Sequence, residues 1–410
     1  MAHKILDEWD TLVSLLPANW EQLADDHKQL LVKHGNAKIT NAGDLLRLIL
    51  LHAAADLPLR QTVALVAQAG GPSLSPMRLH KKMIRAGGFL HALVTAMVDA
   101  PMGLAPEKWA GYVVSAVDAT TISRPGSVSG DGRIHLRMRL NDLKYLQVRC
   151  TGIDQGESFR GFDFEPGELV IGDRGYCNAR GVAHVLDAEA DVLIRMNWIS
   201  MPVCWPGTGD PFDVMNALRE LPRSAAREQD VVVRHVVGKH TRTIYGRLCM
   251  MRLPEHEAAK ARRRVRREHG ANVKADTLEA AGYVVLFTTT PHERLSAAQC
   301  LELYRLRWQI ELQFKRWKTL CGFDRMPNFR PDTIESWLYA KTLAAVLLEK
   351  LASLHSGVFS PIDCDDDEVE MRRAHGEAAL EADPAALVLA RVRALADAAM
   401  RTAAQSQSRR

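Results

Sequence analysis

The chain lacks the sequence features of a membrane, secreted or nucleotide-hydrolysing protein. No apolar run approaches the roughly 18 residues that a membrane-spanning helix needs, so we expect no membrane partner. The first residues lack the apolar core of a signal peptide, and no G-x-x-x-x-G-K-S/T loop for a nucleoside triphosphate occurs. These absences favour a protein of the cytoplasm.

Cysteines and charges are present, but neither forms a pattern that identifies a function. The seven cysteines are odd in number and none forms a C-x-x-C pair, which argues against a zinc module and a disulfide framework. The net charge of +4 is too small to indicate nucleic acid by itself. It is unevenly spread, because six of the eight residues 260–267 are basic and residues 363–370 are mostly acidic. Either run is also typical of a solvated helix face, and the acidic run of a linker.

The 410-residue chain exceeds the usual size of one core, so we expect two or three domains. Its N-terminal part, residues 1–105, has the pattern of a helical domain. Asp44 is suited to cap one helix, a second follows Pro58 and ends at a Gly-Gly pair, and Ser75 and Pro76 begin a third. The third helix carries Arg78, Lys81, Lys82 and Arg85. Helix, glycine turn and basic helix resemble a DNA-binding helix-turn-helix, and the alternative is a small bundle with a solvated basic face.

The middle of the chain changes to a mixed pattern of strands and helices. Two apolar runs end in an acidic residue, the first at Asp118 and the second at Asp173. Alternating residues between them predict an antiparallel pair of strands, and residues 199–290 have a β-rich pattern. The expected strands are 112–117, 134–140, 145–152, 168–172, 192–196, 231–237, 243–250 and 283–288, and a helix is expected over 178–187.

A long helix is predicted from a capping box at residues 296–299 to about residue 322. At about 100° per residue its side chains Tyr304, Arg307, Glu311 and Lys318 form one row beside an apolar stripe. Such a row suits a metal and a phosphate backbone, since the carboxylate binds a cation and the other three groups hold phosphate oxygens. The alternative is a surface helix on which Glu311 pairs with a basic residue at four-residue spacing.

Asp118, Asp173 and Glu311 are candidate ligands for divalent metal ions. The strands of a mixed sheet direct their carboxyl ends to a common edge, where sites are often found. Three carboxylates that converge there can hold two Mg²⁺ or Mn²⁺ ions for phosphoryl transfer. Taken singly, either aspartate is typical of a turn at the end of a strand. The combination with the Glu311 helix favours the metal site.

Together, these residues resemble the DDE transposases of bacterial insertion sequences, in particular the insertion-sequence-four family with the Y-R-E-K signature. The motifs are Asp118-Ala-Thr-Thr, Asp173-Arg-Gly-Tyr and the row from Tyr304 to Lys318, and the resemblance covers about residues 30–350. It implies an α/β fold: an RNase H-like catalytic core with a mixed sheet, interrupted by a β-rich insertion and preceded by an all-helical DNA-binding domain. The expected segments are 1–105 for DNA binding, 106–198 and 291–350 for the core, 199–290 for the insertion, and 351–410 for a helical tail.

The resemblance also implies roles for individual residues. Asp118, Asp173 and Glu311 would bind the catalytic Mg²⁺, with Mn²⁺ as an alternative. Contacts with DNA phosphates near the transposon end would come from Tyr304, Arg307, Lys318 and Arg174. Tyr283 stands where relatives have a tryptophan that stacks on a flipped base, and a phenol ring can also stack.

The function that we predict from the sequence is that of a cut-and-paste DNA transposase. It would bind the inverted repeats of its own element as a homodimer, cleave their ends and join them to target DNA, in the bacterial cytoplasm and in association with the nucleoid. One alternative is a non-catalytic repressor or decayed transposase that only binds DNA, which a lost acidic residue would indicate. Another is an RNase H-like nuclease without strand transfer.

Overall fold

The computed structural model describes residues 9–27, 31, 39–54, 56–99, 109–123, 130–141, 143–222, 225–270, 273–323 and 333–356. The expected tail over residues 351–410, with its acidic run, lies outside these residues apart from the end of the last helix. No helix in the described parts of the chain is both long and apolar enough to cross a membrane.

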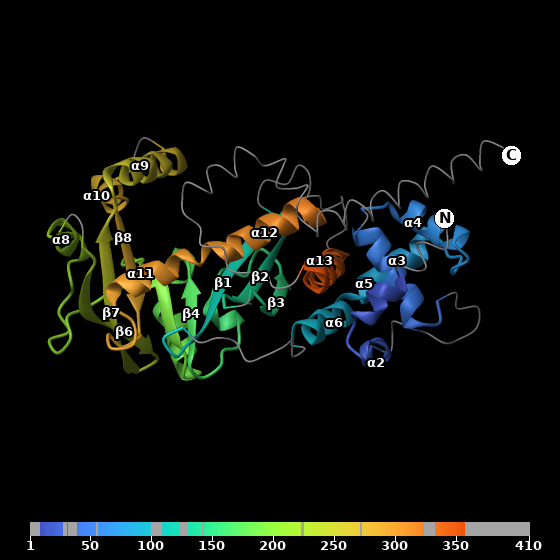
Figure 1. The fold of residues 1–410 in the computed structure, drawn as a ribbon, viewed down its shortest axis with the longest axis horizontal. Helices are drawn as coiled ribbons and strands as arrows, with labels where there is room; N and C mark the ends of the chain where they lie inside the picture. The colour runs from blue at the N-terminus through green and yellow to red at the C-terminus, as the bar shows by residue number, and fades with distance from the viewer. Residues whose placement is uncertain are drawn as a thin grey trace.

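One eight-stranded mixed sheet forms the centre of the molecule (Figure 1). Its strands are β1 (Val113–Ile122), β2 (Gly132–Arg139), β3 (Tyr145–Thr151), β4 (Glu168–Gly172), β5 (Asp191–Arg195), β6 (Arg227–Val237), β7 (His240–Arg252) and β8 (Tyr283–Thr288). They lie in the order β3-β2-β1-β4-β5-β8-β7-β6. β4 is parallel to both β1 and β5, whereas the other neighbours are antiparallel. The first five strands therefore confirm the expected RNase H-like core.

Helices cover both faces of this sheet. The helices that follow β3 are α7 (Ala179–Asp187), α8 (Val214–Arg219), α9 (Glu255–His269), α10 (Ala275–Ala280), α11 (Ala297–Arg305) and α12 (Trp308–Cys321), with 3₁₀ turns η1 (Phe159–Gly161) and η2 (Arg174–Tyr176). Ala116 of β1 packs in one hydrophobic cluster with Phe314 of α12, and Val117 packs in another with Val182 of α7. Successive residues of β1 thus point to α12 and to α7 in turn, as strand geometry requires.

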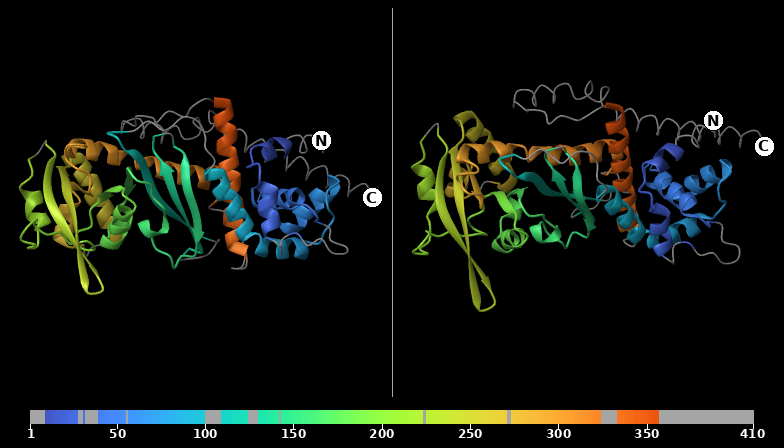
Figure 2. Two further views of the ribbon diagram at one scale, coloured as in Figure 1. Left: turned by 90° about the horizontal axis from the view of Figure 1, so that it is seen from below. Right: turned by 60° about the horizontal axis from the view of Figure 1, so that its bottom comes forward.

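The helices that precede the sheet gather at one end of the long axis of the molecule (Figures 1 and 2). They include α2 (Trp20–Asp26), α3 (Ala42–Ala54), α4 (Leu59–Gln68), α5 (Pro76–Arg85) and α6 (Gly87–Asp99). The long helix α13 (Ile334–Ser356) stands between them and the sheet and packs on α3 and α6. One continuous hydrophobic cluster runs through these helices, α13 and the α12 face of the sheet. The helical part is therefore joined to the core by packing.

The sequence correctly predicted the start of the basic helix but not the cap of the helix near residue 42. Ser75 caps α5, since its hydroxyl accepts a hydrogen bond from the Arg78 N–H (3.3 Å). Asp44 lies in the first turn of α3 instead of capping it. The side chain of Asn41 takes the cap, because its Oδ1 accepts a hydrogen bond from the Asp44 N–H (2.7 Å).

The expected β-rich insertion does not form a sheet of its own. β8 pairs with β5, and β7 pairs with β8, so the strands of residues 199–290 extend the central sheet. This arrangement covers the edge of β5, which otherwise would have an unpaired row of backbone groups. The helix α9 and the short helix α10 connect β7 to β8.

The prediction of a single helix over residues 296–322 is wrong, because this segment is divided into α11 and α12. At the junction the backbone hydrogen bonds shorten to three-residue steps, from the Arg307 N–H to the Tyr304 carbonyl (3.1 Å) and from the Ile310 N–H to the Arg307 carbonyl (3.1 Å). This is 3₁₀ geometry, which tightens the turn and changes the direction of side chains. Neither glycine nor proline occurs there, so no residue type in the sequence predicts the break.

Candidate active site

Strand alternation in β1 directs Asp118 toward α12. Asp118 lies two residues beyond Ala116, which packs against the α12 face, so its side chain points to that face as well. β1 continues past Asp118 to Ile122, whereas the sequence predicted an end there. What ends is the pairing with β4, whose last matched pair is Ala116 and Ile171. Asp118 therefore lies immediately beyond the parallel part of the sheet.

Asp173 lies at the same edge of the sheet, directly after β4. It caps the turn η2, because its Oδ1 accepts a hydrogen bond from the Gly175 N–H (2.7 Å). Glycine at 175 leaves room for another carboxylate, since a Cβ there would collide with the side chain of Glu157. Burial and the charge of Asp173 raise the pKa of Glu157. Glu157 is thus a fourth acidic residue at this edge, and its loop has no sequence pattern that could have identified it.

Arg307 joins two of the predicted metal ligands. Its Nη2 lies 2.5 Å from Glu311 Oε1, and its Nη1 lies 3.9 Å from Asp118 Oδ2. The four-residue pair that the surface-helix alternative predicted is therefore present. It is a partly buried pair, because the side chains of Arg307 and Glu311 are 18% and 34% exposed. The junction between α11 and α12 positions the guanidinium against the sheet.

The carboxylates affect one another electrostatically. Burial raises the pKa of Asp118 to about 7, against a hydrogen bond from the Ala119 N–H, which lowers it. The charges of Asp173 and Glu311 raise it further, and the charge of Arg307 lowers it. Asp118 and Glu311 both approach Arg307, and Asp173 is close enough to Asp118 to raise its pKa.

A cluster of cationic and phenolic side chains lines the same site. Burial is the main cause that raises the pKa of Tyr304 to about 12, and the neighbouring charges of Arg307 and Arg195 oppose this rise. The Arg307 guanidinium carbon is 5.6 Å from the centre of the Tyr304 ring. Burial lowers the pKa of Arg195, and its neighbours include Tyr304, Arg174 and Arg307. Arg195 and Arg307 are partly buried and Arg174 is exposed, and guanidinium groups in such a position are suited to bind a phosphate.

Arg195 was missed by the sequence analysis. It is the last residue of β5, the strand parallel to β4, and so it ends at the same edge as Asp173. No hydrogen bond or ion pair of its side chain is recorded among the described residues. Arg195 could have been identified as an arginine at the carboxyl end of a predicted strand, because the strand that ends before Asp173 was also predicted.

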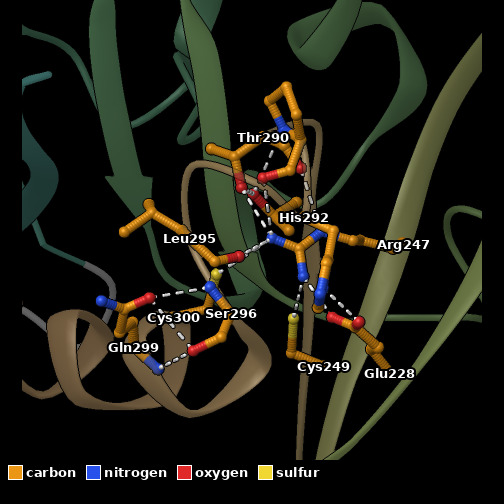
Figure 3. A network of polar contacts seen from close by, with 11 residues as sticks. Glu228, Arg247, Cys249, Thr290, His292, Leu295, Ser296, Gln299 and Cys300 are labelled. Carbon is orange, nitrogen blue, oxygen red and sulfur yellow. Dashed lines mark hydrogen bonds and ion pairs between the residues drawn. The ribbon is translucent and has the colours of Figure 1, made fainter. Parts of the chain in front are cut away.

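A buried arginine of β7 fixes the start of α11 (Figure 3). Arg247 donates hydrogen bonds to the Thr290 carbonyl (3.0 Å) and hydroxyl (3.2 Å), to the Leu295 carbonyl and to Glu228. The helix then begins with the capping box that the sequence predicted, in which Ser296 Oγ accepts from the Gln299 N–H (3.3 Å). This network ties the helix that carries Tyr304 to the sheet.

Lys318 lies on the same side of α12 as Glu311 but farther along the helix. The two residues are two turns apart, which corresponds to about 10 Å along the axis. Lys318 is therefore near the far end of the site rather than within the arginine cluster around Tyr304.

The structure does not expose Tyr283. The residue begins β8, and its side chain is only 7% exposed. The Arg252 guanidinium carbon lies 5.4 Å from the centre of the ring, and Arg252 Nη2 donates to the Tyr283 hydroxyl (3.2 Å). To stack on a flipped base, the ring would need this guanidinium to move, so the role of Tyr283 stays a prediction.

The predicted recognition helix α5 presents most of its basic residues to solvent. Arg78, Lys81 and Arg85 are exposed and Lys82 is half-buried, whereas Leu79 and Met83 are buried against the other helices. The fold thus separates a basic side from an apolar side, as a helix that contacts DNA requires. It lies far from the carboxylates, at the opposite side of α13 (Figure 2).

Carboxylate oxygens suit a hard divalent metal ion, so Asp118, Asp173 and Glu311 have the right donor chemistry. No three Asp, Glu, His or Cys side chains in the described parts of the chain are close enough to hold a metal ion as they stand. The guanidinium of Arg307 lies between Asp118 and Glu311, so it would have to move for both carboxylates to bind one ion.

Comparison with known proteins identifies the family of this chain. The family described as "Transposase DDE domain" matches residues 109–347. The transposase of insertion sequence element IS421 from Escherichia coli is 31% identical over 324 residues, which are 77% of this chain and 86% of that protein. The transposase of IS231F from Bacillus thuringiensis subsp. israelensis is 43% identical over 67 residues, or 16% of this chain and 14% of that protein.

The transposase domain implies a DNA substrate and a general dependence on divalent metal ions. The domain covers more than half of the chain, and the similarity to IS421 extends over most of it. The chain therefore belongs to the DDE transposases of bacterial insertion sequences, enzymes that cleave and transfer DNA.

Proposed function

We propose that this transposase works by a cut-and-paste pathway on the inverted repeats at the ends of its own element. Water first hydrolyses a phosphodiester bond at each end and frees a 3′-hydroxyl. That hydroxyl attacks the opposite strand to form a hairpin, water reopens the hairpin, and the same hydroxyl then attacks a phosphodiester bond of target DNA.

The observation that supports this proposal is that Arg307 links Asp118 of β1 to Glu311 of α12, with Asp173 directly after the neighbouring strand β4. The three carboxylates would hold Mg²⁺, with Mn²⁺ as an alternative, after Arg307 has left Glu311. The metal supplies activation of the attacking oxygen and stabilisation of the leaving oxygen. Partial burial supports this role, since a charge interaction is stronger where water is excluded.

The basic residues of the site would hold the DNA backbone. Arg307 and Arg195 lie beside Tyr304, and their guanidinium groups can bind phosphate oxygens in pairs. Arg174 directly follows Asp173 and would contact the strand that is cut. Lys318 would contact a phosphate about two helical turns of α12 away.

Binding of the repeats is assigned to α5, with Arg78, Lys81, Lys82 and Arg85 as contacts. Because the element has two ends, we propose that a homodimer brings them together, each chain holding one end. The six cysteines of the described residues are free, and together with the DNA substrate they support a place in the bacterial cytoplasm, with the nucleoid.

The test supplies the purified chain with duplexes that carry the element's own terminal repeat, in Mg²⁺. We expect nicking at the repeat boundary and joining of the product to target DNA. A second duplex, already cut to expose the 3′-hydroxyl, separates the pathway from simple hydrolysis. Failure to join this pre-cut end to target DNA, with intact nicking, would identify a nuclease instead of a transposase.

A further inference from the structure

Three exposed arginines lie together on one side of the helix α9. Arg263, Arg266 and Arg267 are exposed, and at about 100° per residue they fall on one side of the helix. The buried residue Ala258 lies on the other side, toward the protein. We refer to Arg263, Arg266 and Arg267 as the arginine face of α9.

Within the described parts of the chain, the arginine face does not contribute ion pairs that would stabilise α9. The acidic residues of the helix pair with other cations: Glu257 with Lys260, Glu255 with Arg262, and Glu268 with Arg264. For the arginine face no ion pair is recorded among the described residues. Like charges at three- and four-residue spacing destabilise a helix. A helix that needed only solubility would be more stable with acidic residues interspersed on this face.

The strand order brings α9 to the edge of the sheet that carries the active site. β7 ends at Arg252, which pairs with Tyr283 at the start of β8. β8 is antiparallel to β5, so the start of β8 lies at the edge where β5 ends with Arg195. β5 is parallel to β4, which ends immediately before Asp173. Since α9 begins at Glu255, just after β7, it shares an edge with the carboxylates.

The arginine next to this face connects it electrostatically to the active site. Burial lowers the pKa of Arg195, and among the charges that lower it further are those of Arg174, Arg307 and Arg264. Arg264 belongs to α9, so this helix lies within electrostatic range of Arg195. Duplex DNA carries a phosphate charge about every 1.7 Å along its axis, which the arginines of α9 and of the site complement.

The position of α9 in the molecule indicates which side of the cleavage point it would contact. α9 and the N-terminal helices α3–α5 lie at opposite ends of the long axis, with the site between them (Figure 1). In one chain, DNA that is held by α5 on one side of the cleavage point would therefore meet α9 on the other side.

We propose that the arginine face of α9 binds the phosphate backbone of the duplex that flanks the transposon end, outside the cleavage point. This assignment rests on the proposed function, because it takes the DNA end as the substrate of the site. The contacts are with phosphates, so they hold flanking DNA of any sequence. Arginine is suited to this role because its guanidinium can bind two phosphate oxygens at once.

The experiment compares the full chain with a variant in which Arg263, Arg266 and Arg267 are replaced by glutamine. The exposed residues Arg227, Arg234 and Lys239 of the β6–β7 hairpin, also changed to glutamine, are a control with the same loss of charge. Affinity is measured against salt for two duplexes in Ca²⁺. One ends at the repeat boundary, and the other continues for about two helical turns, roughly 20 base pairs, of arbitrary flanking DNA.

We expect the α9 variant to lose affinity for the flanked duplex and to keep its affinity for the pre-cut end. Its slope of log K against log salt with the flanked duplex should decrease by up to about 3, close to one unit per phosphate contact. The hairpin control should resemble the wild type with both duplexes.

Equal loss on both duplexes would overturn the proposal and assign α9 to the transposon side of the cut. An unchanged slope of log K against log salt would mean that the arginine face is a solvated surface without DNA contacts. Thermal melting distinguishes misfolding, since removing like charges should leave Tm unchanged or raise it. If the wild-type protein neither prefers the repeat over other DNA nor cuts it, the proposed function fails. That result does not depend on the α9 variant.

Discussion

At the residue scale, Arg307 is the group on which the metal-free state of the site depends. It neutralises Glu311 directly and lies close to Asp118, so two carboxylates can stay near each other without a metal. The same guanidinium is a predicted phosphate ligand. Binding of a metal ion to the carboxylates would release the Arg307 guanidinium. The released guanidinium could then bind a DNA phosphate.

A first prediction is that metal and Arg307 compete for the same carboxylates. Arg307→Gln should raise the affinity of the DNA-free protein for Ca²⁺, because the ion no longer has to displace a guanidinium from Glu311. Isothermal titration calorimetry at pH 8 measures this affinity. Lys315→Gln, a change of an exposed cation on the same helix, is the control and should have little effect. Weaker or equal Ca²⁺ binding by the Arg307 variant would contradict the competition.

A second prediction concerns pH and Asp118. The pKa of this residue is raised to about 7, chiefly by burial, from an ordinary value of about 3.9. Its contribution to folding is therefore fully present below about pH 4 and is lost as pH rises to 7, at about 1.4 kcal/mol per pKa unit. In EDTA, urea unfolding should show that Asp118→Asn removes a few kcal/mol of this pH dependence. The exposed control Asp230→Asn should retain it, and parallel curves for wild type and Asp118→Asn would refute the assignment.

At the scale of elements, a buried ion pair holds β2 and β4 in place under the site. Arg137 Nη1 lies 2.8 Å from Glu168 Oε2, and the two side chains are only 9% and 3% exposed. Glu168 also accepts hydrogen bonds from the Ser115 hydroxyl and from the Glu165 N–H (3.1 Å). It thereby connects the strand of Asp118 to the strand that ends at Asp173.

A third prediction follows from this buried pair. Glu168→Ala leaves a buried guanidinium without its partner and should lower the free energy of unfolding by about 3–5 kcal/mol. Urea denaturation measures the loss. Glu293→Ala, a truncation of an exposed glutamate, is the control and should change stability by less than about 0.5 kcal/mol. A similarly small effect of Glu168→Ala would mean that the pair does not support the sheet.

The elements of this fold were largely predictable because their signals are local. The N-cap at Ser75, the capping box at Ser296 and the apolar runs before Asp118 and Asp173 each depend on neighbouring residues. The burial of Arg137 on β2 was not predictable, since alternation with apolar residues indicated a solvated face. Its partner Glu168 lies on another strand, and only the tertiary fold brings the two together.

The candidate site was predictable to a similar extent. Asp173 follows the end of β4 as the sequence predicted, whereas β1 continues past Asp118 and only its parallel pairing ends before that residue. Arg195 and Glu157 were not found, because they join the site through the order of strands and through a loop packed on Gly175. The break between α11 and α12 directs Arg307 toward Asp118. It was also not predictable, because no glycine or proline marks it in the sequence.

At the scale of the whole molecule, α13 joins the helical part to the catalytic core. Lys341 of α13 donates to Asp56 Oδ1 (2.5 Å), which precedes α4, and to the Cys321 carbonyl at the end of α12 (2.7 Å). Ser336 donates to the Met83 carbonyl of α5. Because the hydrophobic cluster is also shared, the N-terminal helices should be tested within the full chain. The boundary expected at residue 105 lies outside the described residues.

A fourth prediction concerns recognition by α5. Replacing Arg78, Lys81 and Arg85 by glutamine should weaken binding to the element's repeat and reduce its preference over random DNA. Fluorescence anisotropy with both duplexes measures the ratio of affinities. The hairpin variant of Arg227, Arg234 and Lys239 provides the charge-matched control. Equal loss on both duplexes would indicate a basic surface without sequence recognition.

The central claim is that three carboxylates form the catalytic site, and Glu311→Gln tests it most directly because it removes charge with little change in volume. Glu302→Gln on α11 is the matched control, since Glu302 is exposed. Cleavage of a duplex carrying the element's end is measured in Mg²⁺, together with binding of the same duplex. The account predicts that Glu311→Gln loses cleavage by orders of magnitude while it retains binding, and that Glu302→Gln cleaves normally. Normal cleavage by Glu311→Gln would contradict the assignment of this site.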